Sequence, residues 1–162
     1  MDHPFRRTLF DVTVWTVSLG AMMFIVAHEA WAGSRSYVAT NPTWHAECGS
    51  CHFAYPPQLL PAPAWRDIMA GLNRHFGSDA SVSPGAAVEI GAFLEQHAGS
   101  DRRASAAQTL RITEAAWFGR EHDKVSAAVW KLPAVRTPAN CTACHTTAER
   151  GDFRERNIRI PR

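Results

Sequence analysis

Two short stretches of the chain place two cysteines and a histidine together at a fixed spacing. Residues 48–52 read Cys-Gly-Ser-Cys-His, and residues 141–145 read Cys-Thr-Ala-Cys-His. Both match C-x-x-C-H, the attachment signature of c-type haem, in which two thiols bond to one porphyrin and the next residue offers an imidazole to the iron. We therefore expect two covalently bound haem c groups. The attachment residues are the four cysteines of the chain: Cys48, Cys51, Cys141 and Cys144.

Two other kinds of site also use paired C-x-x-C motifs. A Cys₄ zinc site usually separates its pairs by about 15–20 residues, and the separation here is far longer. A redox-active dithiol normally sits in a βαβ pattern, which this sequence does not show. The histidine directly after each motif favours haem over both alternatives, because neither alternative needs it.

The second ligand on each iron separates an electron carrier from a catalyst, because an open coordination position admits a substrate. His52 and His145 are the expected first ligands, since each completes a C-x-x-C-H motif. Past residue 32 the only methionine is Met69, so at most one haem can take a His/Met pair. The other histidines in that part of the chain are His45, His75, His97 and His122.

Spacing favours two of these histidines as second ligands. His122 is the nearest histidine upstream of His145, and the chain beyond His145 contains neither histidine nor methionine. His75 follows Ile68 by seven residues, which places both on one side of a predicted helix. Met69 points elsewhere on that helix, and we expect it in the wall of the pocket.

His45 and His97 stay open as alternative ligands. His97 lies at the end of a predicted helix, where a histidine interacts favourably with the helix dipole. His45 precedes His52 by seven residues, so it does not easily reach the opposite face of the haem that His52 binds. It could still serve the other haem or hydrogen-bond a propionate.

The first 32 residues have the order of an export signal. Arg6 and Arg7 precede an apolar run over residues 12–27, which is followed by Ala30-Trp31-Ala32. This run is shorter than the roughly 20 residues that a membrane-spanning helix needs. We therefore predict cleavage after Ala32 and a soluble, periplasmic mature protein. An uncleaved membrane anchor is the alternative.

The rest of the chain reads as mostly helical. We predict a helix over residues 43–51 capped by Asn41 or Thr43, an amphipathic helix over residues 63–76, and a helix that starts at Ser83-Pro84 and ends before Gly99. Shorter helices are expected near residues 113–118 and 126–130, and the only candidate strand is residues 158–160. A small, polar stretch, residues 99–108, predicts a linker. The haem domains are then residues 33–98 and residues 109–162.

Composition excludes some classes of function. The chain has 162 residues, of which 46% are hydrophobic and 20% charged, as in a globular protein. Lys and Arg number 17 against 15 Asp and Glu. This excess is too small and too dispersed for the basic face of a nucleic-acid binder, so no nucleic-acid partner is expected.

At this point the residues resemble a known family, the small periplasmic dihaem cytochromes c. The strings that carry the resemblance are residues 47–52, 54–61, Trp65, 75–77, 112–114, 117–118, 120–122, 140–145, 151–153 and 159–161. The resemblance implies a first domain like a class I cytochrome c, followed by a small, irregular, largely helical C-terminal haem domain. It also implies bis-histidine ligation, with His75 opposite His52 and His122 opposite His145.

The resemblance further implies a low-potential carrier that passes electrons to an oxygen-binding cytochrome c, sometimes from a membrane b-type cytochrome. We therefore expect an electron-transfer protein and not an enzyme. The main alternative is a haem enzyme, such as a peroxidase or a small-oxyanion oxidoreductase, with one open or exchangeable iron. A sensor is a further alternative, although no signalling domain follows.

Two details of the haem surroundings are also expected. A hydrogen bond from Nδ1 of His52 to a carbonyl within residues 55–61 would orient the ligand. Large aromatic side chains would form walls against the porphyrins. These are Trp44, Trp65, Phe76, Trp117 and Trp130.

Overall fold

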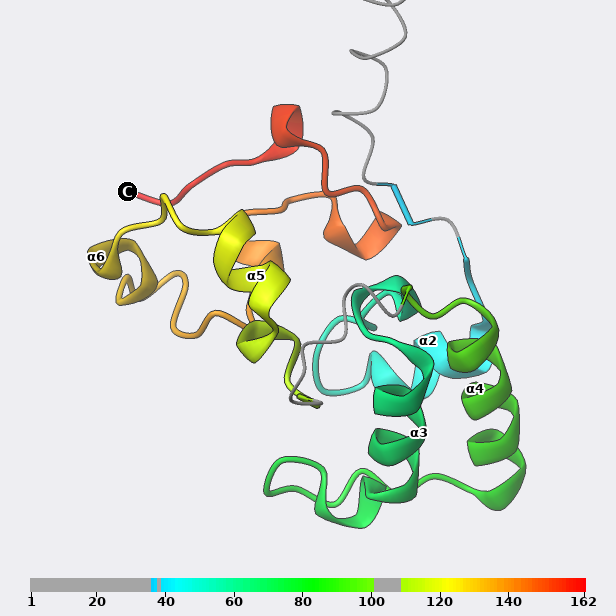
Figure 1. Ribbon diagram of the computed structural model, residues 1–162. Helices are drawn as coiled ribbons and strands as arrows, with labels where there is room; N and C mark the ends of the chain where they lie inside the picture. The colour runs from blue at the N-terminus through cyan, green and yellow to red at the C-terminus, as the bar shows by residue number, and fades with distance from the viewer. Residues whose placement is uncertain (1–35, 38, 101–108) are drawn as a thin grey trace, which may run out of the picture. The chain divides into compact units, whose positions relative to one another are not determined.

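The computed structural model describes residues 36–37, 39–100 and 109–162. The predicted signal peptide and most of the predicted linker lie outside these residues. Within them the regular structure is helical, and β pairing is limited to isolated bridges (Figure 1). The prediction of a mostly α fold is confirmed.

The described part of the chain contains five α-helices joined by loops and short 3₁₀-helices. The α-helices are α2 (Pro42–Cys48), α3 (Ala62–Ala70), α4 (Pro84–Gln96), α5 (Ala116–Glu121) and α6 (Ala127–Trp130). The 3₁₀-helices are η1 (Pro57–Leu59), η2 (Leu72–Arg74), η4 (Ile112–Glu114), η5 (Cys141–Ala143), η6 (Ala148–Arg150) and η7 (Glu155–Asn157).

The hydrophobic core lies among α2, α3 and α4. Helix α3 packs along α4, and α2 also contacts α4. Leu60, Ile90 and Leu94 are almost fully buried at these contacts. Trp44 and Trp65 add large aromatic surfaces to the same core, and burial of such surfaces is a main stabilising contribution in a small domain.

Two helices begin where their capping residues predict. The side chain of Asn41 accepts a hydrogen bond from the backbone N–H of Trp44 at 2.8 Å and so caps α2. Ser83 accepts a hydrogen bond from the backbone N–H of Ala86 at 3.3 Å and caps α4, whose first turn contains a proline.

Helix α3 is shorter than predicted. The apolar spacing predicts a helix to residue 76, but α3 ends at Ala70 and Gly71 follows as its C-cap. Glycine is a weak helix former, and the chain continues as η2 before Phe76 and Gly77 adopt positive φ angles of 48° and 101°. The helical-face argument for His75 is therefore wrong, because His75 lies in the turn beyond the helix.

The segment after residue 109 has little apolar core of its own. Leu110 and Ile112, at its start, pack against the core of α2, α3 and α4. Farther along, the buried apolar side chains are Ala115, Phe118, Val135 and Ala148. Helices as short as α5 and α6 are not stable in isolation, so this segment depends on what it packs against.

Contacts join the two predicted haem domains, and Arg35–Arg162 groups as one compact unit. The domain boundaries at residues 98 and 109 therefore stay a prediction.

In the tail, residues 158–160 form no regular strand; Ile158 makes a single bridge with His145. None of the helices in the described ranges combines the length and the apolar character that crossing a membrane requires.

The start of the described chain pairs with the C-terminal segment. Ser36 and Asp152 form an antiparallel bridge, and the N–H of Tyr37 donates to the carbonyl of Gly151 at 2.7 Å. Gly151 has a φ of 69°, and a Cβ at this position would lie 1.9 Å from the carbonyl oxygen of Tyr37. Only glycine accepts both this backbone conformation and this close approach.

Replacing Gly151 by alanine is expected to lower the free energy of unfolding of the holoprotein. A left-handed conformation costs an L-residue about 1–2 kcal/mol, and the added Cβ also displaces Tyr37. Gly119 in α5 provides a matched control, because a Cβ there meets nothing within 4 Å. Gly119→Ala should stabilise by about 0.5–1 kcal/mol. Denaturant titration measures both changes, and a Gly151→Ala protein as stable as the wild type would contradict the close approach.

Candidate functional site

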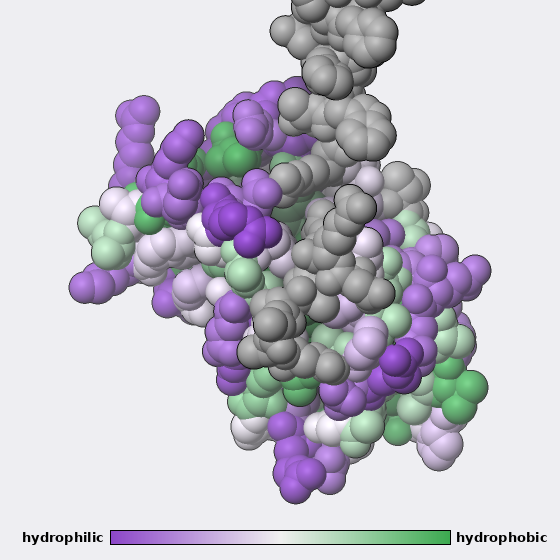
Figure 2. Space-filling view, in the orientation of Figure 1, coloured by the Kyte–Doolittle hydropathy of each residue, from purple (hydrophilic) through white to green (hydrophobic). Residues whose placement is uncertain are grey.

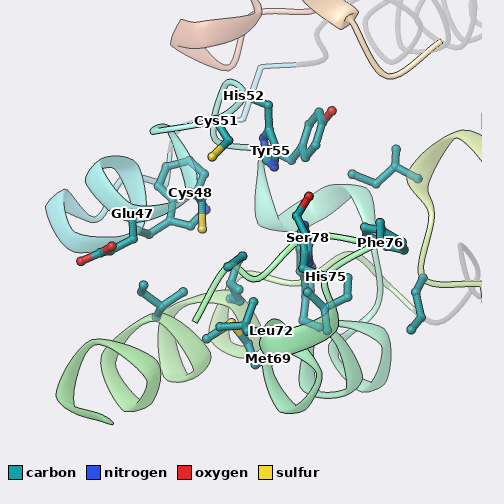
Figure 3. A pocket seen from close by; sticks show the side chains of 18 of the residues that line it. Glu47, Cys48, Cys51, His52, Tyr55, Met69, Leu72, His75, Phe76 and Ser78 are labelled. Atoms are coloured by element: carbon teal, nitrogen blue, oxygen red, sulfur yellow. The ribbon is translucent and has the colours of Figure 1, made fainter. Parts of the chain in front are cut away.

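The first C-x-x-C-H motif opens on a cavity of about 520 Å³, a size that proteins use for ligands and cofactors. Helix α2 ends at Cys48, and Cys51 and His52 follow in the next turn. His75 enters the cavity from the turn after η2. Figure 3 shows His52 and His75 on opposite sides of the space, with the sulfur atoms of Cys48 and Cys51 at its margin.

The two histidines of this cavity are spaced as ligands of one metal ion. Their ring centroids are 6.4 Å apart and their planes differ by 25°. Metal–nitrogen bonds of about 2.0–2.1 Å, with about 1.1 Å more from nitrogen to ring centre, would separate two opposed imidazoles by about 6.3 Å. The pair of His52 and His75 therefore fits an iron held between them.

A backbone carbonyl fixes the tautomer of His52. Its Nδ1 lies 2.7 Å from the carbonyl oxygen of Phe53. Since a carbonyl only accepts, Nδ1 donates the hydrogen and Nε2 keeps its lone pair for a metal. The predicted bond to a carbonyl of residues 55–61 is therefore wrong, because the acceptor is the carbonyl of the next residue, Phe53.

The second motif has an equivalent pair. Cys141 begins η5, and Cys144 and His145 follow it directly. The rings of His122 and His145 are 6.1 Å apart, with planes at 78°. Nδ1 of His122, at the end of α5, donates to the carbonyl of Phe118 at 2.9 Å. This distance also fits a metal ion between two imidazoles, now with nearly perpendicular rings.

Burial lowers the pKa of one histidine in each pair and so disfavours its charged imidazolium form. It lowers the pKa of His75, with His52 and Arg111 adding to the effect. Burial also lowers the pKa of His145, with a further contribution from His122. Neutral imidazole is the form that binds a metal ion.

The cysteines do not support the two alternative chemistries. Burial raises the pKa of Cys48 and of Cys141 to about 11, because removal from water disfavours the thiolate that a redox dithiol uses as its nucleophile. All four cysteines are among the described residues, and within those residues no three His, Cys, Asp or Glu side chains converge on a metal site.

The remaining candidate ligands of the chain past residue 32 are His45, His97 and Met69. His45 is exposed on α2, and His97 caps the end of α4 with its ring 5.0 Å from Phe93. Neither lines the cavity of the first motif, whereas Met69 does so as part of the wall.

The aromatic residues expected as haem walls are distributed over both motif sites. Trp44, Trp65 and Phe76 line the first cavity. Trp130 lies 5.9 Å from the ring of His122, and Trp117 lies 6.0 Å from Phe118, which itself stacks on His122 at 4.1 Å.

Sequence reasoning missed the residues that the second segment contributes to the first cavity. Leu110, Arg111, Ile112, Ala139 and Cys141 all line it. The guanidinium of Arg111 lies 4.2 Å from the ring centre of Phe76. These residues are distant in sequence from residues 48–76, so no local pattern could assign them to this cavity.

Sequence reasoning also missed the role of Tyr55. Its ring stacks on His52 at 4.6 Å and 26°, and its hydroxyl donates to the carbonyl of Ala139 at 2.8 Å. Burial raises the pKa of Tyr55 to about 12, with Cys141 adding to the effect, so the hydroxyl stays a donor. The only local signal is an aromatic residue three positions after a motif histidine.

A protein family and several solved structures are similar to this chain. A family described as dihaem cytochrome c matches residues 44–153. The chain is 41% identical to a dihaem cytochrome c from Rhodobacter sphaeroides, with a TM-score of 0.67, covering 73% of this chain and 100% of that one. It is also 41% identical to a dihaem cytochrome of type c from Shewanella baltica, with a TM-score of 0.67 and coverage of 76% and 95%. Among curated proteins no significant match was found.

Proposed function

The chain belongs to the dihaem cytochrome c family, and on that premise we propose that it is a low-potential periplasmic carrier whose two irons are each held between two histidines. As a member of this family it carries two haem c groups and transfers electrons with other redox proteins. The observation that carries the assignment of ligands is the distance between the ring centroids in each histidine pair, 6.4 Å in one pair and 6.1 Å in the other. We assign His52 and His75 to one iron, and His122 and His145 to the other.

Haem supplies reversible one-electron chemistry when it is bound. The protein's part is to hold strong ligands in place so that little moves when an electron arrives or leaves. Carbonyl acceptors on Nδ1 of His52 and His122 orient the rings and raise their basicity as ligands. Neither assigned pair contains a methionine, whose ligation raises the reduction potential. These features support a low potential.

Filled coordination on both irons favours a carrier over an enzyme, because an enzyme needs an open or exchangeable position. The fully reduced protein should therefore show no spectral change on exposure to carbon monoxide. Visible absorption spectra with and without the gas measure this. Binding of carbon monoxide by either haem of the wild-type protein would favour the alternative, a peroxidase or small-oxyanion oxidoreductase.

Export and partners follow as finer parts of the same proposal. The composition of residues 1–32 supports removal of a signal peptide and a mature chain that starts at Gly33; mass spectrometry of the exported protein tests this, and a chain starting at Met1 would contradict it.

The resemblance supports an oxygen-binding cytochrome c as acceptor and a membrane b-type cytochrome as donor. Stopped-flow mixing of the reduced protein with such an acceptor should show rapid oxidation of both haems, and slow or absent oxidation would remove that partner.

A further inference from the structure

Three aromatic side chains that were not among the predicted wall residues connect the two motif histidines through ring contacts. Resting on the function proposed above, we propose that Phe53, Tyr55 and Phe153 form an aromatic bridge that sets the spacing of the two haems and thereby the rate of electron exchange between them. They are positioning residues, because each acts through a ligand or an attachment segment.

The bridge starts at the first motif. Tyr55 stacks on His52 at 4.6 Å, and Phe53 meets Tyr55 edge to face at 4.7 Å. Phe53 and Tyr55 lie in a loop that is also bound to the core helix α3. The indole N–H of Trp65, in α3, donates to the buried carbonyl of Pro57 at 2.7 Å. This bond restrains the loop that places Tyr55 against His52.

The bridge then crosses to the second motif. Phe53 and Phe153 lie 6.5 Å apart at 45°, although they are 100 residues apart in the chain. Phe153 lies 5.1 Å from the ring of His145. Ring contacts thus run without a gap from His52 to His145, the expected ligands that belong to the two C-x-x-C-H motifs.

A hydrogen bond runs parallel to these ring contacts. The hydroxyl of Tyr55 donates to the carbonyl of Ala139, two residues before Cys141. Tyr55 therefore contacts a ligand of the first site and the attachment segment of the second. A displacement of either segment would have to break this bond or unstack the ring.

Contacts within the chain also hold Phe153, at the second end of the bridge. Tyr37 packs edge to face on Phe153 at 5.5 Å, and its N–H binds the carbonyl of Gly151. The carboxylate of Asp152, the residue before Phe153, accepts hydrogen bonds from Arg154 and Asn157. Both ends of the bridge are thus held by contacts within the chain, which favours a single spacing.

Electron exchange across this spacing involves no bond formation. An electron passing between the two haems would oxidise one iron and reduce the other, with no bond made or broken. Exchange between two fixed centres depends steeply on their separation, so loss of the bridge should slow it. A purely structural role for these aromatic residues would change stability and leave the exchange rate unchanged.

The test uses the full holoprotein with both haems. Phe153→Leu and Phe53→Leu remove a ring at the crossing, Tyr55→Phe removes only the hydrogen bond, and Phe153→Tyr keeps the ring. Phe93→Leu is the matched control, because Phe93 is a buried core aromatic that contacts Trp44 and His97 and has no part in the bridge. The readouts are the exchange rate after photoreduction of a half-reduced sample and the iron–iron distance from pulsed EPR.

We expect a several-fold slower exchange and a broader distance distribution in both leucine variants at the crossing, and a smaller change in Tyr55→Phe. Phe153→Tyr and Phe93→Leu should match the wild type. Unchanged rates and distances in the leucine variants would overturn the inference. Loss of a low-spin haem spectrum in them would also overturn it, since the ring would then support ligation and not spacing. Failure of the proposed function is separate: it would appear as a wild-type protein that lacks two low-spin, bis-histidine haems.

Discussion

A protein in which Cys141 and Cys144 are both replaced by alanine is expected to keep its first haem and lose the structure of its second segment. The core of α2, α3 and α4 does not include that segment apart from Leu110 and Ile112. The buried apolar side chains beyond these two are few and mostly small. Binding of a central apolar group then contributes directly to folding, as a metal does in small metallo-domains.

Hydrogen exchange followed by mass spectrometry measures this loss. Amides from about residue 116 onward should exchange as in an unfolded chain, whereas residues 42–96 should stay protected and the first haem should stay low-spin. Thr142→Ala is the matched control, because it changes the same motif without removing a thiol. The hydroxyl of Thr142 donates a hydrogen bond to the side chain of Asn140. Native-like protection beyond residue 116 in the cysteine variant would reveal an independent core and contradict the claim that this segment needs its haem to fold.

Replacing His75 or His122 by alanine should open one iron at a time. The reduced variant should then bind carbon monoxide at one of its two haems, while the other haem stays low-spin and unreactive. The reason is that each histidine is one member of a pair at ligand spacing, and alanine offers no lone pair. Carbon monoxide difference spectra, with haem content as the reference, give the stoichiometry.

The same chain offers matched controls for this experiment. His45→Ala and His97→Ala remove histidines that lie away from the first cavity, so both haems should remain closed. Because Met69 lines that cavity, His75→Ala should also be made with Met69→Leu, which prevents the thioether from replacing the imidazole. If His122→Ala leaves both haems closed, then His45 or His97 is the true ligand and the assignment of the second pair is wrong.

Short-range features were predictable from the sequence. The two C-x-x-C-H motifs need only five adjacent residues, and the caps at Asn41 and Ser83 act over three residues. The sequence also pointed to His75 and His122 as candidates, although the helical argument for His75 failed when α3 ended at Gly71. An apolar stripe continues through a 3₁₀ turn almost as it does through a helix, so periodicity alone does not locate the end of α3.

Long-range features were not predictable in the same way. The contact of Phe53 with Phe153 and the bond from Tyr55 to Ala139 join segments that are far apart in the chain. Neither contact leaves a periodic or spacing signal, because an aromatic residue in a loop is equally compatible with many partners. The pairing of residues 36–37 with residues 151–152 has only the glycine at position 151 as a local indication.

The EPR spectrum of the fully oxidised protein tests the central claim, that both irons are held between the assigned histidine pairs. The relative orientation of the two ligand planes sets the splitting of the iron d orbitals that carry the unpaired electron. The planes of His52 and His75 differ by 25°, and those of His122 and His145 by 78°. We predict two low-spin ferric signals, one rhombic and one strongly anisotropic with a larger maximum g value, and no high-spin signal. A high-spin signal, or two signals of the same type, would contradict it.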